Sequence, residues 1–202
     1  MSKENNIKEK FKLALLSTAN AIADDFSIKK DKDSQKKVKT DFFELEKLEN
    51  RSDFVKYRAE IDSGALKKKF SNIEIFKSNF PQNPSYRQLY ELSEKIRCEI
   101  LGSKILKGVG ANLKENYINQ ISFKKKDQLN SKEDVSVNEA FELYMLKNFY
   151  KIDLNKLNEK ILSYWENDFD KSLKKHLNFL LENLENQETY NSKVSEILQN
   201  LD

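Results

Sequence analysis

The sequence predicts a mainly α-helical, multi-helix domain, and three observations support this prediction. Apolar residues recur at every third or fourth position in most of the chain, as they do along one face of an amphipathic helix. Only 4 glycines and 2 prolines occur among 202 residues, which is too little turn chemistry for a many-stranded β-sandwich or barrel. Aromatic residues make up 11% of the chain, so a wholly disordered chain is not expected, although 34% of the residues are charged.

The first helix is predicted over residues 7–23, where Ile7, Phe11 and Ile22 lie on one apolar face. After this helix the pattern changes to an alternation of polar and apolar residues. That alternation allows a small β-hairpin near residues 26–39. A solvated charged loop also explains these residues, so the sequence leaves both structures open.

A second helix is predicted over residues 54–70, because apolar residues again recur there at helical spacing. Gly64 inside this segment weakens the helix by about 1 kcal/mol relative to alanine. Both prolines of the chain then fall within residues 80–85. Proline disfavours helical geometry in the residue before it, so a helix is expected to end before Pro81.

The strongest apolar stripe follows this break and extends from Leu89 to Tyr117. It predicts either one long helix or two helices broken at Gly102, with Ser85 as the N-cap. The polar residues 122–134 are then predicted to connect this part of the chain to the next.

The last part of the chain is predicted to form short helices. Ser136 and Glu139 have the spacing of a capping box, so a helix is expected to begin after Ser136 and to continue to Phe149. Asp153 and Asp168 are the expected caps of the next two helices. Three further helices are predicted, over residues 154–165, 169–184 and 190–201.

These elements are expected to form a single helical domain over residues 1–202. It consists of an N-terminal piece (residues 1–47), with the first helix and the hairpin or loop, and a helical body (residues 48–202). The chain has 36 Lys and Arg residues against 33 Asp and Glu residues, a net charge of +3. This balance does not indicate a strongly cationic nucleic-acid binder, so a nucleic-acid partner is not expected.

The single cysteine and the single histidine exclude a disulfide framework and a Cys/His zinc site formed within one chain. No apolar run reaches the roughly 20 residues needed to span a bilayer. We therefore expect no membrane association and a cytoplasmic protein with a reduced thiol.

No catalytic, cofactor-binding or metal-ligating residue is predicted from the residues themselves. Three of the four glycines lie in the segment 102–110, but their spacing is not that of a phosphate-binding loop. Small residues that let two helices approach closely, or that change the direction of a helix, are the simpler explanation of this segment. Asp62 and Ser63 are interpreted as part of a solvated helix face, His176 as a boundary residue and Cys98 as a small packing residue.

A more specific signal is the block Arg97–Leu113, which reads Arg-Cys-Glu-Ile-Leu-Gly-Ser-Lys-Ile-Leu-Lys-Gly-Val-Gly-Ala-Asn-Leu. An Arg-x-Glu-x-x-Gly-Ser stretch shortly followed by Gly-Val-Ala-x-Asn is typical of the amino-terminal region of the CobT subunit of aerobic cobaltochelatase, and the chain resembles that family. The similarity extends to residues 11–23 and 135–146. The matching residues are Arg97, Glu99, Gly102, Ser103, Gly108, Val109 and Asn112, and all of them except Val109 are the candidate interaction residues.

The resemblance implies a subunit, or a fragment of a subunit, of the ATP-dependent complex that inserts cobalt into a corrin ring, hydrogenobyrinic acid a,c-diamide, in cobalamin biosynthesis. It implies an assembly role without catalytic residues, so the resemblance leaves open whether the chain is itself an enzyme. The implied partners are an AAA+ ATPase subunit and a large tetrapyrrole-binding subunit. The complex would use ATP, magnesium and cobalt, whereas no cofactor is expected on this chain.

The family continues through an acidic linker into an integrin-type (VWA) domain with a metal-ion-dependent adhesion site. The sequence ends at Asp202, before either of them, so we expect a fragment, a split gene product or a divergent paralogue. The family tends to have a His-Asp pair where this chain has Ser71 and Asn72. The alternative is a stand-alone helical module that binds protein or nucleic acid, suggested by the lysine runs 67–69 and 124–126.

Arg97 and Glu99 are two residues apart on a predicted helix, so they are not expected to pair with each other. Arg97 is expected at the edge of the apolar stripe, where it forms an ion pair or a carbonyl contact with another helix. The helix over residues 54–70, with Glu60 and Asp62, is the first candidate for that contact. Glu99 is expected closer to solvent or to a neighbouring element. The alternative is that both are ordinary surface charges.

Overall fold

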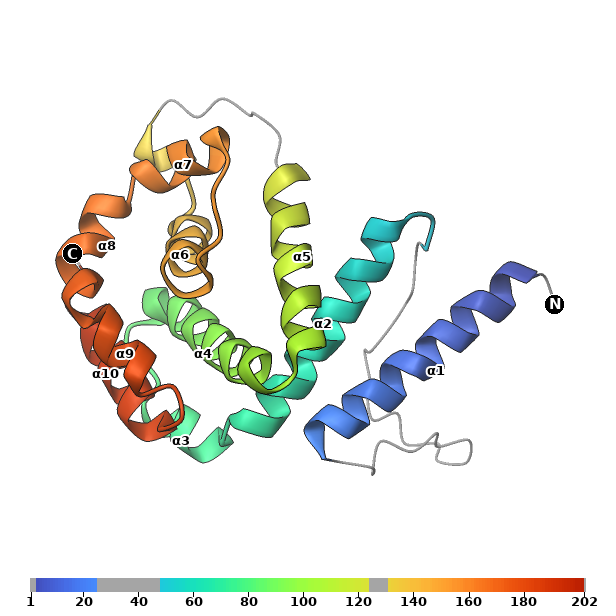
Figure 1. The fold of residues 1–202 in the computed structure, drawn as a ribbon. Coiled ribbons are helices and arrows are strands. Elements are labelled where there is room, and N and C mark those ends of the chain that lie inside the picture. Colours follow the sequence, from blue (N-terminus) through green and yellow to red (C-terminus); the bar gives the residue numbers. More distant parts are fainter. Residues whose placement is uncertain (1–2, 25–47, 124–130, 202) are drawn as a thin grey trace.

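The computed structural model describes residues 3–24, 48–123 and 131–201, and most of them are helical (Figure 1). No strand occurs in these ranges, so the mainly α fold is confirmed. The hairpin predicted near residues 26–39 lies outside the described residues. Among the helices of the described ranges, none combines the length and the apolar character that a membrane crossing requires.

The helices cover all of the segments that the apolar periodicity singles out. The α-helices are, in chain order, α1 (Lys3–Ala23), α2 (Arg51–Phe70), α3 (Ile73–Ser78), α4 (Pro84–Ile105), α5 (Lys107–Phe123), α6 (Val137–Met145), α7 (Lys156–Ser163), α8 (Glu166–Leu173), α9 (Leu177–Glu182) and α10 (Gln187–Gln199). Shorter turns are the 3-10 helices η1 (Lys132–Asp134) and η3 (Lys174–His176) and the π-helix η2 (Leu146–Tyr150).

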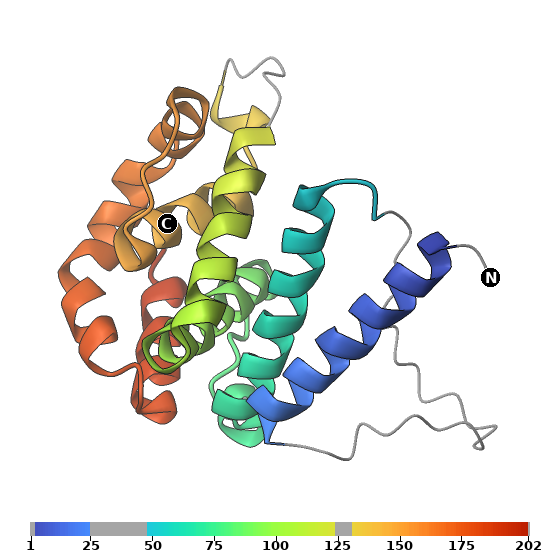
Figure 2. The same ribbon diagram turned by 45° about the vertical axis from the view of Figure 1, so that its right-hand side comes forward.

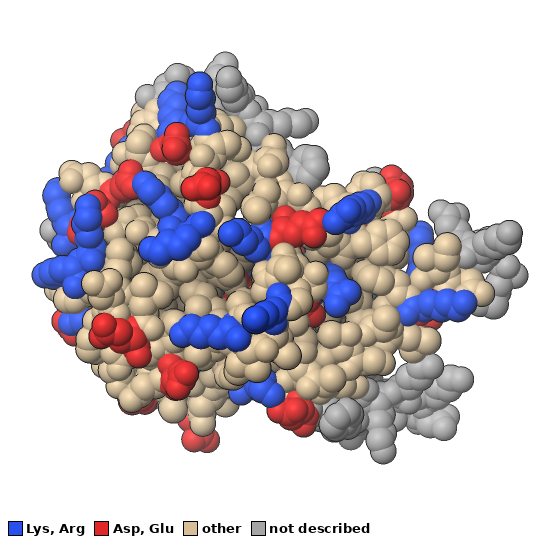
Figure 3. Space-filling model, in the orientation of Figure 1, with Lys and Arg blue, Asp and Glu red and all other residues tan. Residues whose placement is uncertain are grey.

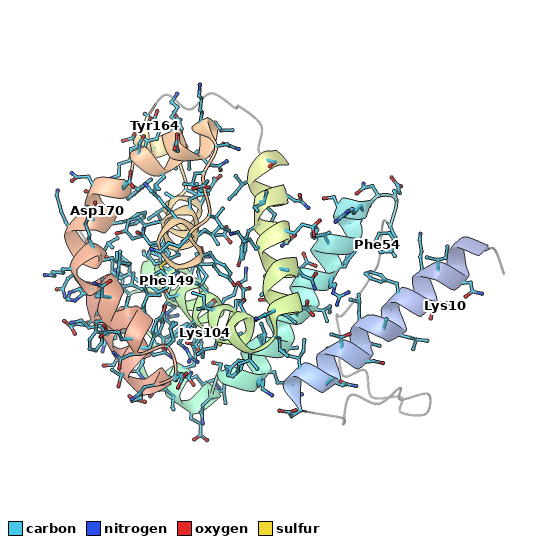
Figure 4. The ribbon with its side chains drawn as sticks, viewed as in Figure 1. Lys10, Phe54, Lys104, Phe149, Tyr164 and Asp170 are labelled. Atoms are coloured by element: carbon cyan, nitrogen blue, oxygen red, sulfur yellow. The ribbon has the colours of Figure 1, made fainter. Side chains whose placement is uncertain are left out.

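Helix α4 is the central element of the fold. It packs against α2 and α5 on one side and against α6 and α10 on the other. Helices α5, α2 and α1 lie side by side, with α1 at the outer edge, as both ribbon views show (Figures 1 and 2). The main partner of α1 is α2, and the ring of Phe54 lies 4.8 Å from that of Phe11 on α1 (Figure 4).

The apolar core has two parts that meet at α4. The larger part lies between α4, α5 and the helices after residue 131, and Tyr90, Ile96 and Phe141 are among its fully buried members. The smaller part lies between α1, α2, α4 and α5 and includes Leu66 and Cys98. Because α4 contributes buried side chains to both parts of the core, its position determines how the two parts lie relative to each other.

Helix α4 begins two residues earlier than the predicted cap implies, and it has a different cap. Asn83, not Ser85, is the N-cap, and its side-chain oxygen accepts a 3.0 Å hydrogen bond from the backbone N–H of Ser85. Pro84 occupies the first turn, where its missing N–H donor costs nothing because that donor has no partner within a helix. The prediction of Ser85 as the cap was therefore wrong.

The apolar stripe is divided into two helices, but the break lies at Leu106 and not at Gly102. Leu106 has φ −115° and ψ 81°, whereas Gly102 lies within α4. The two helices nevertheless stay joined by backbone hydrogen bonds, since the Leu106 N–H donates to Gly102 and the Gly110 N–H donates to Leu106. The second helix also extends to Phe123, past the predicted start of the connector.

The caps in the last part of the chain differ from those predicted. Ser136 is the N-cap of α6, but its side chain forms no capping hydrogen bond. Asn155, not Asp153, caps α7, by accepting a hydrogen bond from Asn158 N–H at 3.0 Å. Asp168 lies in the first turn of α8 and is not its cap. The helix predicted over residues 169–184 is interrupted by η3 and divided between α8 and α9.

Gly102 allows the closest approach between α4 and α2. A Cβ atom at this position would lie 2.8 Å from Cγ of Leu66, and closer still to both of its methyl carbons. Leu66 is fully buried, so an added methyl group would meet it inside the core. The interpretation of this segment as a place of close helix approach is confirmed here.

We expect the Gly102→Ala substitution to lower the free energy of unfolding by about 1–3 kcal/mol, because the added methyl group overpacks a closed interface. The matched control is Gly64→Ala in α2, where an added Cβ would have no neighbour within 4 Å. That change should stabilise the protein by about 0.5–1 kcal/mol through helix propensity. Thermal or urea unfolding of both variants measures the difference, and equal effects would contradict the proposed close packing.

Candidate functional site

Arg97 and Glu94 form a buried ion pair on α4. The Arg97 side chain is 1% exposed and that of Glu94 is 0% exposed. Nε and Nη2 of Arg97 each donate a 2.8 Å hydrogen bond to a different carboxylate oxygen of Glu94. Burial acts to lower the pKa of Arg97, but the hydrogen bonds and charge of Glu94 outweigh it and hold the pKa above its ordinary value.

The same guanidinium reaches two other parts of the chain. Nη2 donates to the carbonyl oxygen of Phe70 at 2.6 Å, and Nη1 donates to that of Leu184 at 2.7 Å. Phe70 is the last residue of α2, and Leu184 lies between α9 and α10. The predicted carbonyl contact with the second helix is therefore present, but it is made at the end of that helix and not at Glu60 or Asp62. Arg97 is a core residue and not a surface charge.

Glu99 is the second buried carboxylate of α4. It is 0% exposed and accepts hydrogen bonds from Ser63 Oγ (2.5 Å), Tyr117 Oη (2.7 Å) and Tyr150 Oη (3.1 Å). Lys95 Nζ lies 4.0 Å from the same carboxylate. Of the two positions expected for Glu99, the structure shows the one against neighbouring elements. These donors come from α2, α5 and η2, so Glu99 connects three elements to α4.

Tyr150 reaches Glu99 from the end of a π-helical turn. The turn ends at Lys151, whose φ of 53° lies in the left-handed region. Burial, and next the charge of Glu99, raise the pKa values of both Tyr117 and Tyr150 above the ordinary value for tyrosine. Both phenols therefore stay protonated at neutral pH and act as donors to Glu99.

Asp62 is the third buried carboxylate, and the interpretation of this position as a solvated face was wrong. It is 0% exposed, and its Oδ2 accepts a 3.2 Å hydrogen bond from Nδ2 of Asn112 on α5. Arg58 Nε lies 3.9 Å away, and Oδ1 has no hydrogen-bond partner among the described residues. Burial raises the pKa of Asp62, although Asn112 and Arg58 partly oppose this effect.

The candidate interaction residues are thus brought together along the contact between α2, α4 and α5. Arg97, Glu99 and Asn112 bind across this contact, and Gly102 allows its close approach. Ser103 donates to the backbone carbonyl of Glu99 at 2.7 Å and would meet any Cβ added to Gly110. Gly108 differs, because it lies in the first turn of α5 with open space around it.

Gln187 supports the same region from α10. Its amide donates to the backbone oxygen of Asn72 (3.0 Å) and to Ser71 Oγ (3.2 Å), and accepts from the Asn72 N–H (2.7 Å). A shallow depression of about 660 Å³ lies over this contact, between residues 69–75 and 185–188. Ser71 and Asn72 therefore hold the turn between α2 and α3 against α10.

The remaining candidate residues have structural environments. Cys98 is 0% exposed, and burial, and next the charge of Glu94, raise the pKa of its thiol, so it is a packing residue. His176 is half-buried in η3, as predicted for a boundary position. Within the described ranges, no group of three or more His, Cys, Asp or Glu side chains is arranged to hold a metal ion. The buried polar groups described above form hydrogen bonds that connect one helix to another.

Sequence reasoning missed Glu94, Tyr150 and Gln187. Glu94 could have been found, because its spacing of three residues from Arg97 is that of a helical ion pair. The hydrogen-bond partner of Tyr150 lies 51 positions away in the chain, and that of Gln187 lies 115 positions away. A local sequence pattern does not indicate such distant contacts.

The family model for the cobalamin biosynthesis protein CobT matches residues 5–202. No curated protein and no solved structure matches the chain.

We expect Arg97→Ala to lower the free energy of unfolding by about 3–5 kcal/mol, because it leaves the Glu94 carboxylate buried without a counter-charge. The control is Arg51→Ala, which removes the exposed ion pair between Arg51 and Glu115 and should cost less than about 1 kcal/mol. The double change Arg97→Met with Glu94→Leu should recover part of the loss, since neither charge of this pair remains in the core. Chemical denaturation measures all three. An Arg97→Ala protein as stable as the control would contradict the buried pair.

Asp62 predicts a specific dependence of stability on pH. Its raised folded-state pKa means that the folded protein holds the proton more tightly than the unfolded chain, so this stabilisation is present at acidic pH and is lost as pH rises through the folded pKa. Asp62→Asn removes this dependence. The variant should therefore gain in thermal midpoint relative to the wild type as pH rises from about 4 to 7. A difference that stays constant with pH, or that shrinks, would show that the buried carboxylate is not destabilised by ionisation.

Proposed function

Because the match over residues 5–202 shows that the chain belongs to the CobT family of cobalamin biosynthesis proteins, we propose that it serves as a subunit of the ATP-dependent cobaltochelatase. In this proposal, the complex inserts cobalt into the corrin ring of hydrogenobyrinic acid a,c-diamide. Cobalt is a substrate of the complex, and ATP with magnesium supplies its energy. Family membership supports a role in cobalamin biosynthesis, and the resemblance of the block Arg97–Leu113 supports the more specific assignment.

We assign to the chain an assembly role. The observation that carries this assignment is that polar residues of the block Arg97–Leu113, which we call the family block, form hydrogen bonds inside the fold. Arg97 and Glu99 are buried and form hydrogen bonds with other parts of the fold, and Asn112 donates a hydrogen bond to the buried Asp62. Because these residues hold the helices in one arrangement, they also fix the shape of the outer surface. A surface of constant shape is what a partner subunit can bind.

The proposed partners are an AAA+ ATPase subunit and a large subunit that holds the tetrapyrrole and the metal. The chain forms a defined complex with the ATPase, and the reaction takes place on the large subunit. The chain therefore acts on the rate of cobalt insertion by completing the complex. It is not assigned a step in which its own side chains touch the corrin.

The test is co-purification of the full chain with the cognate ATPase subunit, with and without ATP and magnesium. We expect a stable complex in at least one of these states, and cobalt insertion by the three purified subunits should fall to background when this chain is left out. The control is Arg51→Ala, which changes only an exposed ion pair and should support insertion fully. No association in either nucleotide state, together with cobalt insertion that does not need the chain, would reject the proposal.

A further inference from the structure

Helix α5 carries a regular stripe of exposed residues on its outer side. Lys107, Ala111, Lys114, Ile118 and Ser122 are all exposed and follow one another at spacings of three or four residues, which places them on one face of the helix. We call this set the α5 stripe.

The opposite face of α5 fixes the stripe in place. Val109, Leu113, Tyr117 and Ile121 are between 2% and 8% exposed and belong to the apolar core. The stripe is therefore a preformed and rigid surface, and a partner that binds it does not have to order the helix first.

The α5 stripe combines unpaired positive charge with exposed apolar surface. Neither Lys107 nor Lys114 forms an ion pair with a residue that the structure describes, and the same holds for Lys104 at the end of α4. Ile118 is 44% exposed, and Ile105, two residues before Lys107, is 65% exposed. Figure 3 shows Lys and Arg side chains over the corner where α4 meets α5, and Figure 4 places Lys104 at this corner.

We propose that the α5 stripe is a docking surface for an acidic amphipathic helix of a partner protein. Leucine or isoleucine side chains of that helix pack on Ile118, Ala111 and Ile105. Its glutamate or aspartate side chains pair with Lys107 and Lys114. Identification of the partner as the ATPase subunit rests on the proposed function, whereas the chemistry of the surface does not.

Charge and exposure favour this occupant over two others. A second copy of the chain would present the same lysines to the stripe in a symmetric dimer, and like charges facing each other across an interface are unfavourable. A nucleic acid would gain from the lysines but not from the isoleucines, since surfaces for single strands stack bases on aromatic side chains and the stripe has none. A helix that is both acidic and apolar can pair with the lysines of the stripe and pack on its apolar side chains.

The first arm of the test uses a synthetic, fluorescently labelled helical peptide with a leucine stripe flanked by glutamates. Fluorescence anisotropy should show that the wild-type chain binds it, more weakly as salt rises. The double variant Lys107→Glu/Lys114→Glu should bind at least about ten-fold more weakly, because like charges then face the peptide. The same variant should gain affinity for a matched peptide in which lysines replace the glutamates.

The matched control is the double variant Lys77→Glu/Lys175→Glu. It makes the same change in net charge at exposed positions on α3 and η3, and it should bind the acidic peptide as the wild type does. Ile118→Asp should weaken binding without a charge change at either lysine. All substituted side chains are exposed, so an unchanged thermal midpoint is expected and separates loss of binding from loss of fold.

The inference is overturned if the wild type does not bind the acidic peptide, if both double variants bind it equally, or if a single-stranded oligonucleotide binds the stripe more tightly than the peptide does. The second arm repeats the comparison with the ATPase subunit. Binding of the ATPase to the wild type and to Lys107→Glu/Lys114→Glu alike would reject the stripe as its docking site and leave the proposed function intact. A chain that binds the peptide through the stripe but never the ATPase would reject the proposed function alone.

Discussion

The ion pair between Arg97 and Glu94 is the interaction on which the rest of the structure depends. A guanidinium and a carboxylate that are buried away from water are stable only when their hydrogen-bond donors and acceptors have partners. Glu94 accepts two hydrogen bonds from Arg97, and the carbonyl oxygens of Phe70 and Leu184 accept one more each. The end of α2 and the segment between α9 and α10 are therefore held at fixed positions relative to α4, and the two parts of the apolar core meet around this point.

A polar interior of this kind favours one arrangement of the helices over others that bury a similar apolar area. Apolar contacts tolerate small shifts in register, but the hydrogen bonds of Arg97 and Glu99 are satisfied only in one register. Glu99 accepts hydrogen bonds from donors on three elements, and Gln187 forms hydrogen bonds with both the N–H and the carbonyl oxygen of Asn72. The family block is thus best understood as the part of the chain that specifies the relative positions of α2, α4 and α5.

The helices themselves could be predicted from the sequence, because apolar periodicity is a local property and the buried faces follow it. Helix ends were harder, since Asn83 and Ser85 are both good caps and the choice depends on Pro84 fitting the first turn. The solvated face assigned to Asp62 was wrong because burial of a carboxylate depends on how α2 and α5 meet. The carbonyl partners of Arg97 lie 27 and 87 residues away, and no spacing rule reaches that far.

The position of α1 at the edge of the fold has a consequence for the dynamics of the protein. Among the described residues, α1 packs mainly on α2, and Leu15 and Ile22 are its buried apolar side chains. Helix α4, by contrast, is covered on several sides and contains the charged pair. Separation of α1 from α2 leaves the charged pair and the larger part of the core in place, whereas movement of α4 disrupts both parts of the core. Backbone amides of α1 will therefore exchange with solvent through a local opening of low free energy, and those of α4 only when the whole domain unfolds.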